Sequence, residues 1–212
     1  MPEAGASRRL RLLTVGSLAL TGCLLAPPEP IPLNGPMPRT VMVLPVRPAE
    51  PPGNVAGALL ATIGDALRRR GYEVIPVDRG LARLGELGLS LDRSYPVEDY
   101  AAAARALGAD AFLSVRVERW SARYAPTLVY LGHDLGYRLW DADSGALLWE
   151  MRSHGDWTWD GDEVYYDPSS GLDAYLTPTV KARAFSPYKD DAEAARMIHR
   201  FAMLRLPVCT AR

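Results

Sequence analysis

The chain has 212 residues, 48% hydrophobic and 23% charged, so it is long enough to bury a core and has the composition of a globular protein. Its 24 basic and 25 acidic residues give a formal net charge of −1, which argues against nucleic acid as a partner because phosphate binding requires a basic surface. With two cysteines, 18 glycines and no heptad pattern, the composition also excludes a disulfide scaffold, collagen and a coiled coil.

The first 22 residues have the pattern of a secretory signal. A basic stretch precedes an uncharged run, Leu12–Leu20, that is far too short for a bilayer span of about 20 residues. The run ends in Leu20-Thr21-Gly22-Cys23, which resembles the lipobox of bacterial lipoproteins. The resemblance implies cleavage between Gly22 and Cys23 and attachment of diacylglycerol to the Cys23 thiol. The alternative is a plain secretory signal that happens to contain a cysteine.

An acylated Cys23 would act as a membrane anchor. Two or three acyl chains, including an amide-linked chain such as palmitate, hold a protein stably, whereas one chain binds only marginally. Leu24 follows the cysteine, where an aspartate would resemble the inner-membrane retention signal of enteric-type bacteria. The sequence therefore predicts a lipid-anchored outer-membrane protein whose domain faces the periplasm.

The segment after the anchor is rich in proline. Six prolines in Leu24–Arg39 block helix and sheet hydrogen bonding. Residues 23–39 are therefore predicted to be an extended tether, with a reach on the order of 50 Å in polyproline geometry, and a disordered linker would act in nearly the same way. Cys209 is expected to be a free thiol near a mobile end, with an intermolecular disulfide or a bridge to Cys23 as alternatives.

Residues 40–207 alternate between strand and helix patterns. Strands are predicted over Thr40–Val46, Tyr72–Val77, Ala109–Trp120, Thr127–Trp140 and Ala146–Trp159, and helices over Val55–Arg70, Asp78–Leu87, Pro96–Leu107 and Lys189–Leu206. Right-handed crossovers make the first three strands largely parallel, and turn residues 141–145 join the last two as an antiparallel hairpin. We therefore expect the α/β class: a single domain with a mixed β-sheet and packed helices, followed by a tail at 208–212.

Residue types predict several local features of these elements. Thr40–Val46 is apolar on both faces, so it belongs where a sheet is covered on both sides. Asn54 is expected to cap the first helix, and Asp190 to favour the start of the last. Alternation places three residues of the final strand on one face: Leu147, Trp149 and Met151.

No catalytic chemistry stands out in the sequence. It contains no nucleophile elbow, no phosphate-binding loop and no dinucleotide fingerprint. His133, His154 and His199 have no metal-ligand spacing, although His133 and His154 could face each other across the hairpin. The triplet Arg68–Arg70 is expected to complement the dipole of its helix, with an anion site as the alternative. We therefore predict no catalytic residue, no metal and no cofactor.

The segment Gly155–Pro187 is the most informative for function. It lacks periodicity, and loops of this length are uncommon unless they are functional or mobile. Its aromatic residues indicate a partner-binding loop, because such residues are enriched at interfaces: Trp157, Trp159, Tyr165 and Tyr166. The alternative is a loop folded over the sheet edge with its aromatic side chains packed. A calcium site in this segment would not have the spacing of acidic residues that an EF-hand loop has.

Four short motifs occur in order along the chain: Gly71–Val77, Leu107–Ala111, Val115–Trp120, and Ser144-Gly145 with Leu148-Trp149. Together with the lipobox they resemble domain-of-unknown-function family 799, a group of bacterial lipoproteins that includes a meningococcal surface antigen. The resemblance covers residues 40–150 and implies a fold similar to the TolB amino-terminal and CsgG-like domains of periplasmic assemblies, without catalytic residues. Gly155–Pro187 departs from that family, which has a glycine-rich stretch and a helix there.

These features predict a non-enzymatic, membrane-anchored periplasmic lipoprotein that is an accessory or assembly component of a bacterial envelope complex. Its expected partners are the membrane, through the lipid, and other envelope lipoproteins or a CsgG-like pore component. Two alternatives remain open. One is a hydrolase of envelope polymer with an acid/base pair among Asp156–Asp167, and the other is a small-ligand carrier with an apolar pocket between sheet and helices.

Overall fold

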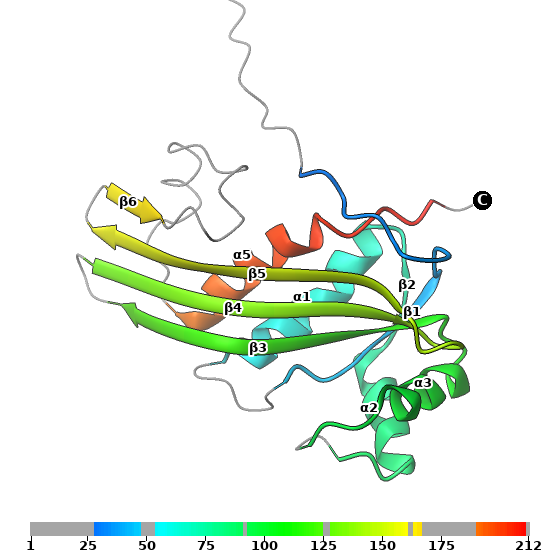
Figure 1. Cartoon of the computed structure of the whole chain (residues 1–212). Coiled ribbons are helices and arrows are strands. Elements are labelled where there is room, and N and C mark those ends of the chain that lie inside the picture. The colour runs from blue at the N-terminus through cyan, green and yellow to red at the C-terminus, as the bar shows by residue number, and fades with distance from the viewer. Residues whose placement is uncertain are drawn as a thin grey trace, which may run out of the picture.

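The computed structural model describes residues 28–47, 54–90, 93–124, 128–160, 163–166 and 190–210. Their elements in chain order are β1 (Thr40–Val43), α1 (Val55–Arg69), β2 (Glu73–Ile75), α2 (Val77–Glu86), α3 (Val97–Ala106), β3 (Ala111–Tyr124), β4 (Leu128–Asp141), β5 (Leu147–Asp160), β6 (Glu163–Tyr166) and α5 (Asp191–Met203). The strands form one mixed sheet in the order β2-β1-β3-β4-β5-β6, with helices packed on it (Figure 1). This arrangement confirms the predicted α/β class. Among the described residues, no helix is long and apolar enough to cross a membrane.

β1 lies in the parallel part of the sheet, between β2 and β3. Val41 and Val43 point into the main core cluster with α1 and α5, whereas Met42 and Leu44 join a second cluster beside α2 and α3. All four side chains are buried, so the prediction of a strand covered on both faces is confirmed. The parallel pairing of β1 with both neighbours also confirms that the first three strands are parallel.

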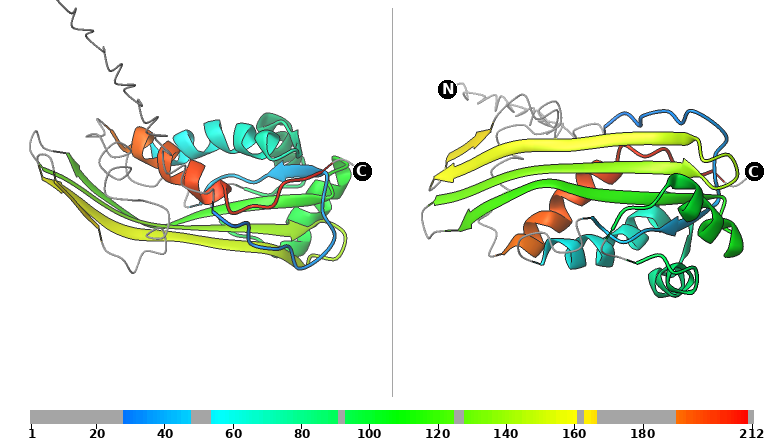
Figure 2. Two further views of the ribbon diagram at one scale, coloured as in Figure 1. Left: turned by 90° about the horizontal axis from the view of Figure 1, so that it is seen from above. Right: turned by 60° about the horizontal axis from the view of Figure 1, so that its bottom comes forward.

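The antiparallel part of the sheet consists of long strands. β3, β4 and β5 have 14 residues each and extend well beyond β1 (Figure 2). The turn between β4 and β5 has the predicted chemistry. The Asp141 carboxylate accepts a hydrogen bond from the Ser144 backbone N–H at 2.7 Å, and Gly145 has a φ of 68°, which favours glycine.

A bulge follows this turn and changes which leucine is buried. Leu147 pairs with Trp140, whereas the next pair along the ladder joins Trp149 to Leu139. The extra residue, Leu148, points into the main core cluster and is 2% exposed. The prediction that Leu147 shares one face with Trp149 was therefore wrong, because strict alternation does not hold across a bulge.

The helices cover the two faces of the sheet to different extents. α1 and α5 lie side by side on one face, and α2 and α3 cover the other face near β1 and the start of β3 (Figure 2). Asp190 lies at the start of α5, as predicted, and it also caps the helix, because its carboxylate accepts a hydrogen bond from the Glu193 N–H at 2.8 Å. Asn54 occupies the predicted N-cap position of α1, but its side chain accepts no capping hydrogen bond.

The proline-rich segment is bound to the domain over residues 28–39. The Ile31 N–H donates to the Arg205 carbonyl at 2.8 Å, and the Asn34 N–H donates to the Leu148 carbonyl at 2.7 Å. The Ile31 and Leu33 side chains pack against the main core cluster. The segment predicted to be a tether therefore contains a docked part, and its residues 23–27 lie outside the described part of the chain.

The C-terminal segment is held by the end of α1. Arg70 donates hydrogen bonds to the carbonyls of Leu204, at 2.7 Å, and Leu206, at 2.8 Å, where the end of α5 exposes carbonyl groups. The Cys209 N–H donates to the Arg70 carbonyl at 2.7 Å, and its thiol lies 3.5 Å from the Pro38 carbonyl oxygen. Cys209 is thus a free but buried thiol in a packed segment, and the prediction of a position near a loose end was wrong.

Candidate functional site

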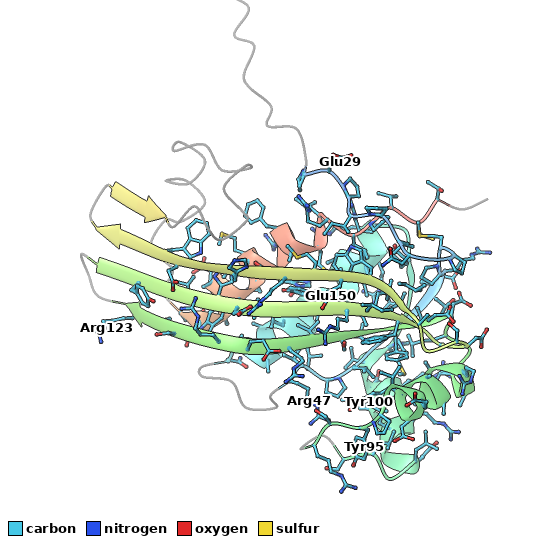
Figure 3. The ribbon with its side chains drawn as sticks, viewed as in Figure 1. Glu29, Arg47, Tyr95, Tyr100, Arg123 and Glu150 are labelled. Carbon is cyan, nitrogen blue, oxygen red and sulfur yellow. The ribbon has the colours of Figure 1, made fainter. Side chains whose placement is uncertain are left out.

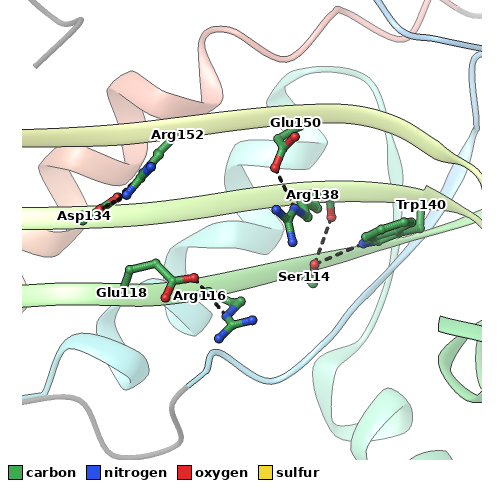
Figure 4. A network of polar contacts seen from close by, with 8 residues as sticks. All are labelled: Ser114, Arg116, Glu118, Asp134, Arg138, Trp140, Glu150 and Arg152. Atoms are coloured by element: carbon green, nitrogen blue, oxygen red, sulfur yellow. Dashed lines mark hydrogen bonds and ion pairs between the residues drawn. The ribbon is translucent and has the colours of Figure 1, made fainter. Parts of the chain in front are cut away.

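Charged side chains occupy the face of β3, β4 and β5 that points away from α1 and α5 (Figure 4). Strand alternation places them there, because their neighbours Val115, Val117 and Tyr137 point into the main core cluster. We call this surface the outer sheet face. Its side chains are Ser114, Arg116, Glu118, Asp134, Arg138, Trp140, Glu150 and Arg152.

Cross-strand ion pairs order this face. The Arg138 Nε lies 2.7 Å from the Glu150 Oε1, and these residues are directly opposite each other on β4 and β5. The Arg152 Nε donates to the Asp134 Oδ1 at 2.8 Å, and this hydrogen bond lowers the pKa of Asp134. Exposed pairs of this kind contribute about 0–1 kcal/mol to stability, so they fix side-chain positions more than they stabilise the fold.

A cavity of about 160 Å³ lies where the layer of α2 and α3 ends and the outer sheet face begins. We call it the arginine cavity, because three arginines line it: Arg47, Arg116 and Arg138. Its aromatic lining residues are Tyr95, Tyr100, Phe112 and Trp140. Figure 3 shows Arg47, Tyr95 and Tyr100 close together near α3. Among the described residues that line the cavity, none is Asp, Glu or His.

Hydrogen bonds and ring contacts hold the walls of the arginine cavity. The Trp140 Nε1 donates to the Ser114 Oγ at 3.3 Å, and the Ser114 hydroxyl donates to the Arg138 carbonyl at 3.3 Å. The Phe112 and Trp140 rings stack with their centroids 6.5 Å apart. On the opposite side, the Arg47 Nη2 donates to the Ser90 carbonyl at 3.3 Å. The cavity is therefore formed by side chains that already have fixed partners.

The guanidinium groups of Arg116 and Arg138 remain able to bind a further acid. Both arginines use Nε in their ion pairs, at 3.1 Å from Glu118 and 2.7 Å from Glu150. Their Nη groups have no hydrogen bond within the described part of the chain and are free for a bidentate contact with carboxylate or phosphate. A second hollow of about 270 Å³ shares Ser114, Arg116 and Arg138, so the surface continues along the outer sheet face.

The residues predicted to form a partner-binding loop lie on strands. Trp157 belongs to β5, and its side chain is 3% exposed in the main core cluster, stacked 6.5 Å from the His133 ring. Its burial contradicts the assignment of Trp157 to a partner-binding loop and agrees with the alternative of packed aromatic side chains, and β5 corresponds to the strand predicted over Ala146–Trp159. Trp159 lies on β5, and Tyr165 and Tyr166 lie on β6; their side chains are outside the described part. Residues 167–189 also lie outside it, as do Gly22 and Cys23.

The acids proposed for a hydrolase are not assembled into an acid/base pair among the described side chains. Asp156 binds Arg119 through both carboxylate oxygens, at 2.7 and 3.2 Å, and accepts a hydrogen bond from the Tyr130 hydroxyl at 2.9 Å. The hydrogen bond from Arg119 lowers the pKa of Asp156, which keeps this carboxylate ionised and unsuited to donate a proton. The side chains of 158–160 and 163–166, and residues 161–162 and 167, lie outside the described part.

The histidines do not form a metal site among the described residues. His133 pairs with Gly155, whereas His154 pairs with Asp134, so His133 and His154 lie on opposite faces and the prediction that they could face each other is wrong. The His133 Nε2 lies 3.1 Å from the Ser153 Oγ, but both side chains are buried. Burial lowers the pKa of His133 to about 4. This serine and histidine pair is therefore closed to substrate and belongs to the core.

Sequence reasoning did not identify the arginine cavity. The available signal was the alternation of Arg116 and Arg138 with buried neighbours, which placed both arginines outside the core. Pairing of β3 with β4 then brings them to one face, and the packing of α3 adds Tyr100. Those contacts depend on register and helix position, which the sequence pattern does not specify.

Comparisons with known proteins describe only a structural similarity. The chain is similar to lipoprotein GNA1162 from Neisseria meningitidis, with a TM-score of 0.47 and 21% identity over 64% of this chain and 90% of that one. It is also similar to the LpoB C-terminal domain from Escherichia coli (TM-score 0.42, 16% identity, 57% of this chain and 85% of that one). A PelC dodecamer from Paraburkholderia phytofirmans gives a TM-score of 0.33 and 15% identity over 68% of this chain and 84% of that one.

No protein-family model and no curated protein matches the sequence. The similar structures include bacterial lipoproteins, but TM-scores below 0.5 do not transfer a function to this chain. Membership in family 799 and the CsgG-like fold therefore stay predictions from the sequence motifs.

Proposed function

We propose that this chain is a lipid-anchored protein of the bacterial envelope that acts by binding another envelope protein rather than by catalysis. The lipobox at residues 20–23 supports the anchor, and Leu24 supports the outer membrane as its location, with the domain facing the periplasm. Cys23 would carry the diacylglycerol, after cleavage that follows Gly22. The role is that of an accessory or assembly component, with another envelope lipoprotein or a pore component as the partner.

One observation carries the binding role: the arginine cavity opens beside the part of the outer sheet face that α2 and α3 leave uncovered. Three arginines and four aromatic residues surround it without an acidic residue, so its chemistry is complementary to a carboxylate carried by a partner. Arginine and aromatic residues are also the types enriched in the cores of protein interfaces. We therefore assign an acidic segment of the partner protein to this cavity.

The two alternative functions have weaker support. A carrier of small ligands needs an apolar pocket of roughly 300–1,000 Å³ between sheet and helices. The arginine cavity has about 160 Å³, and a larger hollow of about 350 Å³ is lined by residues of α1 and α5 and the residues that follow them, with none from the sheet. A hydrolase needs an acid and a base open to substrate, and among the described side chains Asp156 is held by Arg119 while His133 is buried.

Crosslinking in intact envelopes tests this function. A photoreactive residue at Ser114 should capture a partner in wild type, and the double variant Arg116→Glu, Arg138→Glu should abolish capture because it reverses the charge of the cavity. Arg123→Glu is the matched control, since Arg123 is also exposed on β3 but lies far from the cavity (Figure 3). Absence of any crosslinked protein in wild type would contradict the proposal, as would equal capture by the charge-reversed variant.

A further inference from the structure

A second surface lies on the opposite side of the domain, between the C-terminal halves of α1 and α5. A groove of about 350 Å³ has an apolar floor that includes Ala66, Met197, Phe201 and Leu204. Arg69 and Arg200, both exposed, form part of its rim. We call it the helix groove. It is separate from the arginine cavity, because the α1 and α5 residues that line it occupy the other face of the sheet.

The charge around the helix groove is strongly positive. The stretches 61–70 and 196–205 contain six arginines and one acid, Asp65, which lies 2.7 Å from Arg68. Cations suit the C-terminal ends of helices, and Arg70 has a structural role there because it binds carbonyl groups of the segment after α5. Those roles do not account for apolar side chains that remain partly exposed between Arg69 and Arg200.

The segment around Ile31 also lies beside this surface. The Ile31 N–H donates to the Arg205 carbonyl at 2.8 Å, just after the end of α5, and Figure 1 shows this segment passing the end of that helix. Seven residues separate Ile31 from Cys23, and the eight residue-to-residue steps between them span at most about 29 Å when extended. An acyl group on Cys23 would therefore keep the end of α5 close to the bilayer.

From these observations we infer that the helix groove rests on the phospholipid surface, an inference that depends on the proposed anchor. Phe201 and Met197 would reach the level of the acyl chains, while Arg69 and Arg200 would bind lipid phosphates. An apolar strip flanked by arginines is typical of surfaces that lie in the bilayer interface, and guanidinium groups pair well with phosphate. This orientation would direct the outer sheet face away from the membrane and toward a partner.

Depth measurements on the lipidated protein in vesicles test this inference. A nitroxide is attached to Met197→Cys or, as the control on the opposite face, to Ser121→Cys, each in a Cys209→Ala background. Vesicles contain phosphatidylethanolamine and phosphatidylglycerol. We expect the label at residue 197 to gain collisions with oxygen and lose collisions with a water-soluble nickel complex, and the label at 121 to stay in water. The double variant Arg69→Gln, Arg200→Gln should abolish the difference in collision rates between the labels at residues 197 and 121. Arg79→Gln on α2 should leave that difference unchanged.

The possible results separate the groove from the anchor. Protein that floats with vesicles while the residue 197 label stays in water would overturn the inference and leave the anchor intact. Protein that does not float would overturn both. A label that is equally shielded in the unlipidated Cys23→Ser variant, in buffer without detergent or vesicles, would indicate a protein contact, such as a second copy of the chain, and would also overturn the inference. Circular dichroism of each variant confirms that it is folded.

Discussion

Replacing Gly71 with alanine should release the C-terminal segment from the end of α1. Gly71 has a φ of +87°, and an ideal Cβ there would lie 3.2 Å from the Cys209 carbonyl carbon and closer still to its oxygen. The backbone conformation alone costs a residue with a side chain about 1–2 kcal/mol. Moving the Cys209 carbonyl away also weakens the hydrogen bond from its N–H to the Arg70 carbonyl, which contributes about 1 kcal/mol.

The matched control is Gly108→Ala. Gly108 has a φ of +73°, but nothing lies within 4 Å of its ideal Cβ, so this variant has only the conformational cost. In urea denaturation we expect Gly71→Ala to lose about 2–3 kcal/mol of unfolding free energy and Gly108→Ala about 1–2 kcal/mol. Cys209, which is 8% exposed, should also react faster with a maleimide in Gly71→Ala. Equal free energies with an unreactive thiol in both variants would refute the packing of this segment against Gly71.

Two further predictions concern buried polar groups. Burial lowers the pKa of His133 and His199 from 6.5 to about 4, so the unfolded chain binds more protons between these pH values and stability should fall as the pH is lowered from 6.5 to 4. Between pH 6.5 and 4 the unfolding free energy should fall by about 3 kcal/mol for each histidine. In urea denaturation at each pH, His199→Phe should show a pH-dependent loss that is smaller by the contribution of His199. A wild-type unfolding free energy that does not change with pH would contradict this. Trp120→Phe should lower the unfolding free energy by about 2 kcal/mol, because the Trp120 Nε1 donates a hydrogen bond to the Asp191 carboxylate at 2.9 Å. An unchanged unfolding midpoint in urea would argue against that hydrogen bond.

The sequence was sufficient to predict elements whose pattern is local. Val41 to Leu44 are apolar at every position, which required a strand covered on both faces, and the structure has that arrangement. The turn chemistry of Asp141 and Gly145 located the hairpin correctly, because side-chain hydrogen bonding and positive φ are properties of single residues.

Features that depend on contacts distant in sequence were not predictable in the same way. β6 was missed because a four-residue strand at the sheet edge has too few residues to show a period. The buried position of Cys209 depends on Arg70 and Pro38, which are far away along the chain. The arginine cavity requires Arg116, Arg138 and the α3 layer to meet, and only the strand register and helix packing bring them together.

The state of Cys23 tests the central claim most directly. Mass spectrometry of the N-terminal peptide, from protein isolated from bacterial envelopes, should find a chain that begins at Cys23 and carries diacylglycerol on its sulfur. The Cys23→Ser variant should lack this mass and should no longer fractionate with lipid vesicles. A wild-type chain that begins elsewhere or has an unmodified Cys23 would contradict the account, as would a serine variant that still binds vesicles as wild type does.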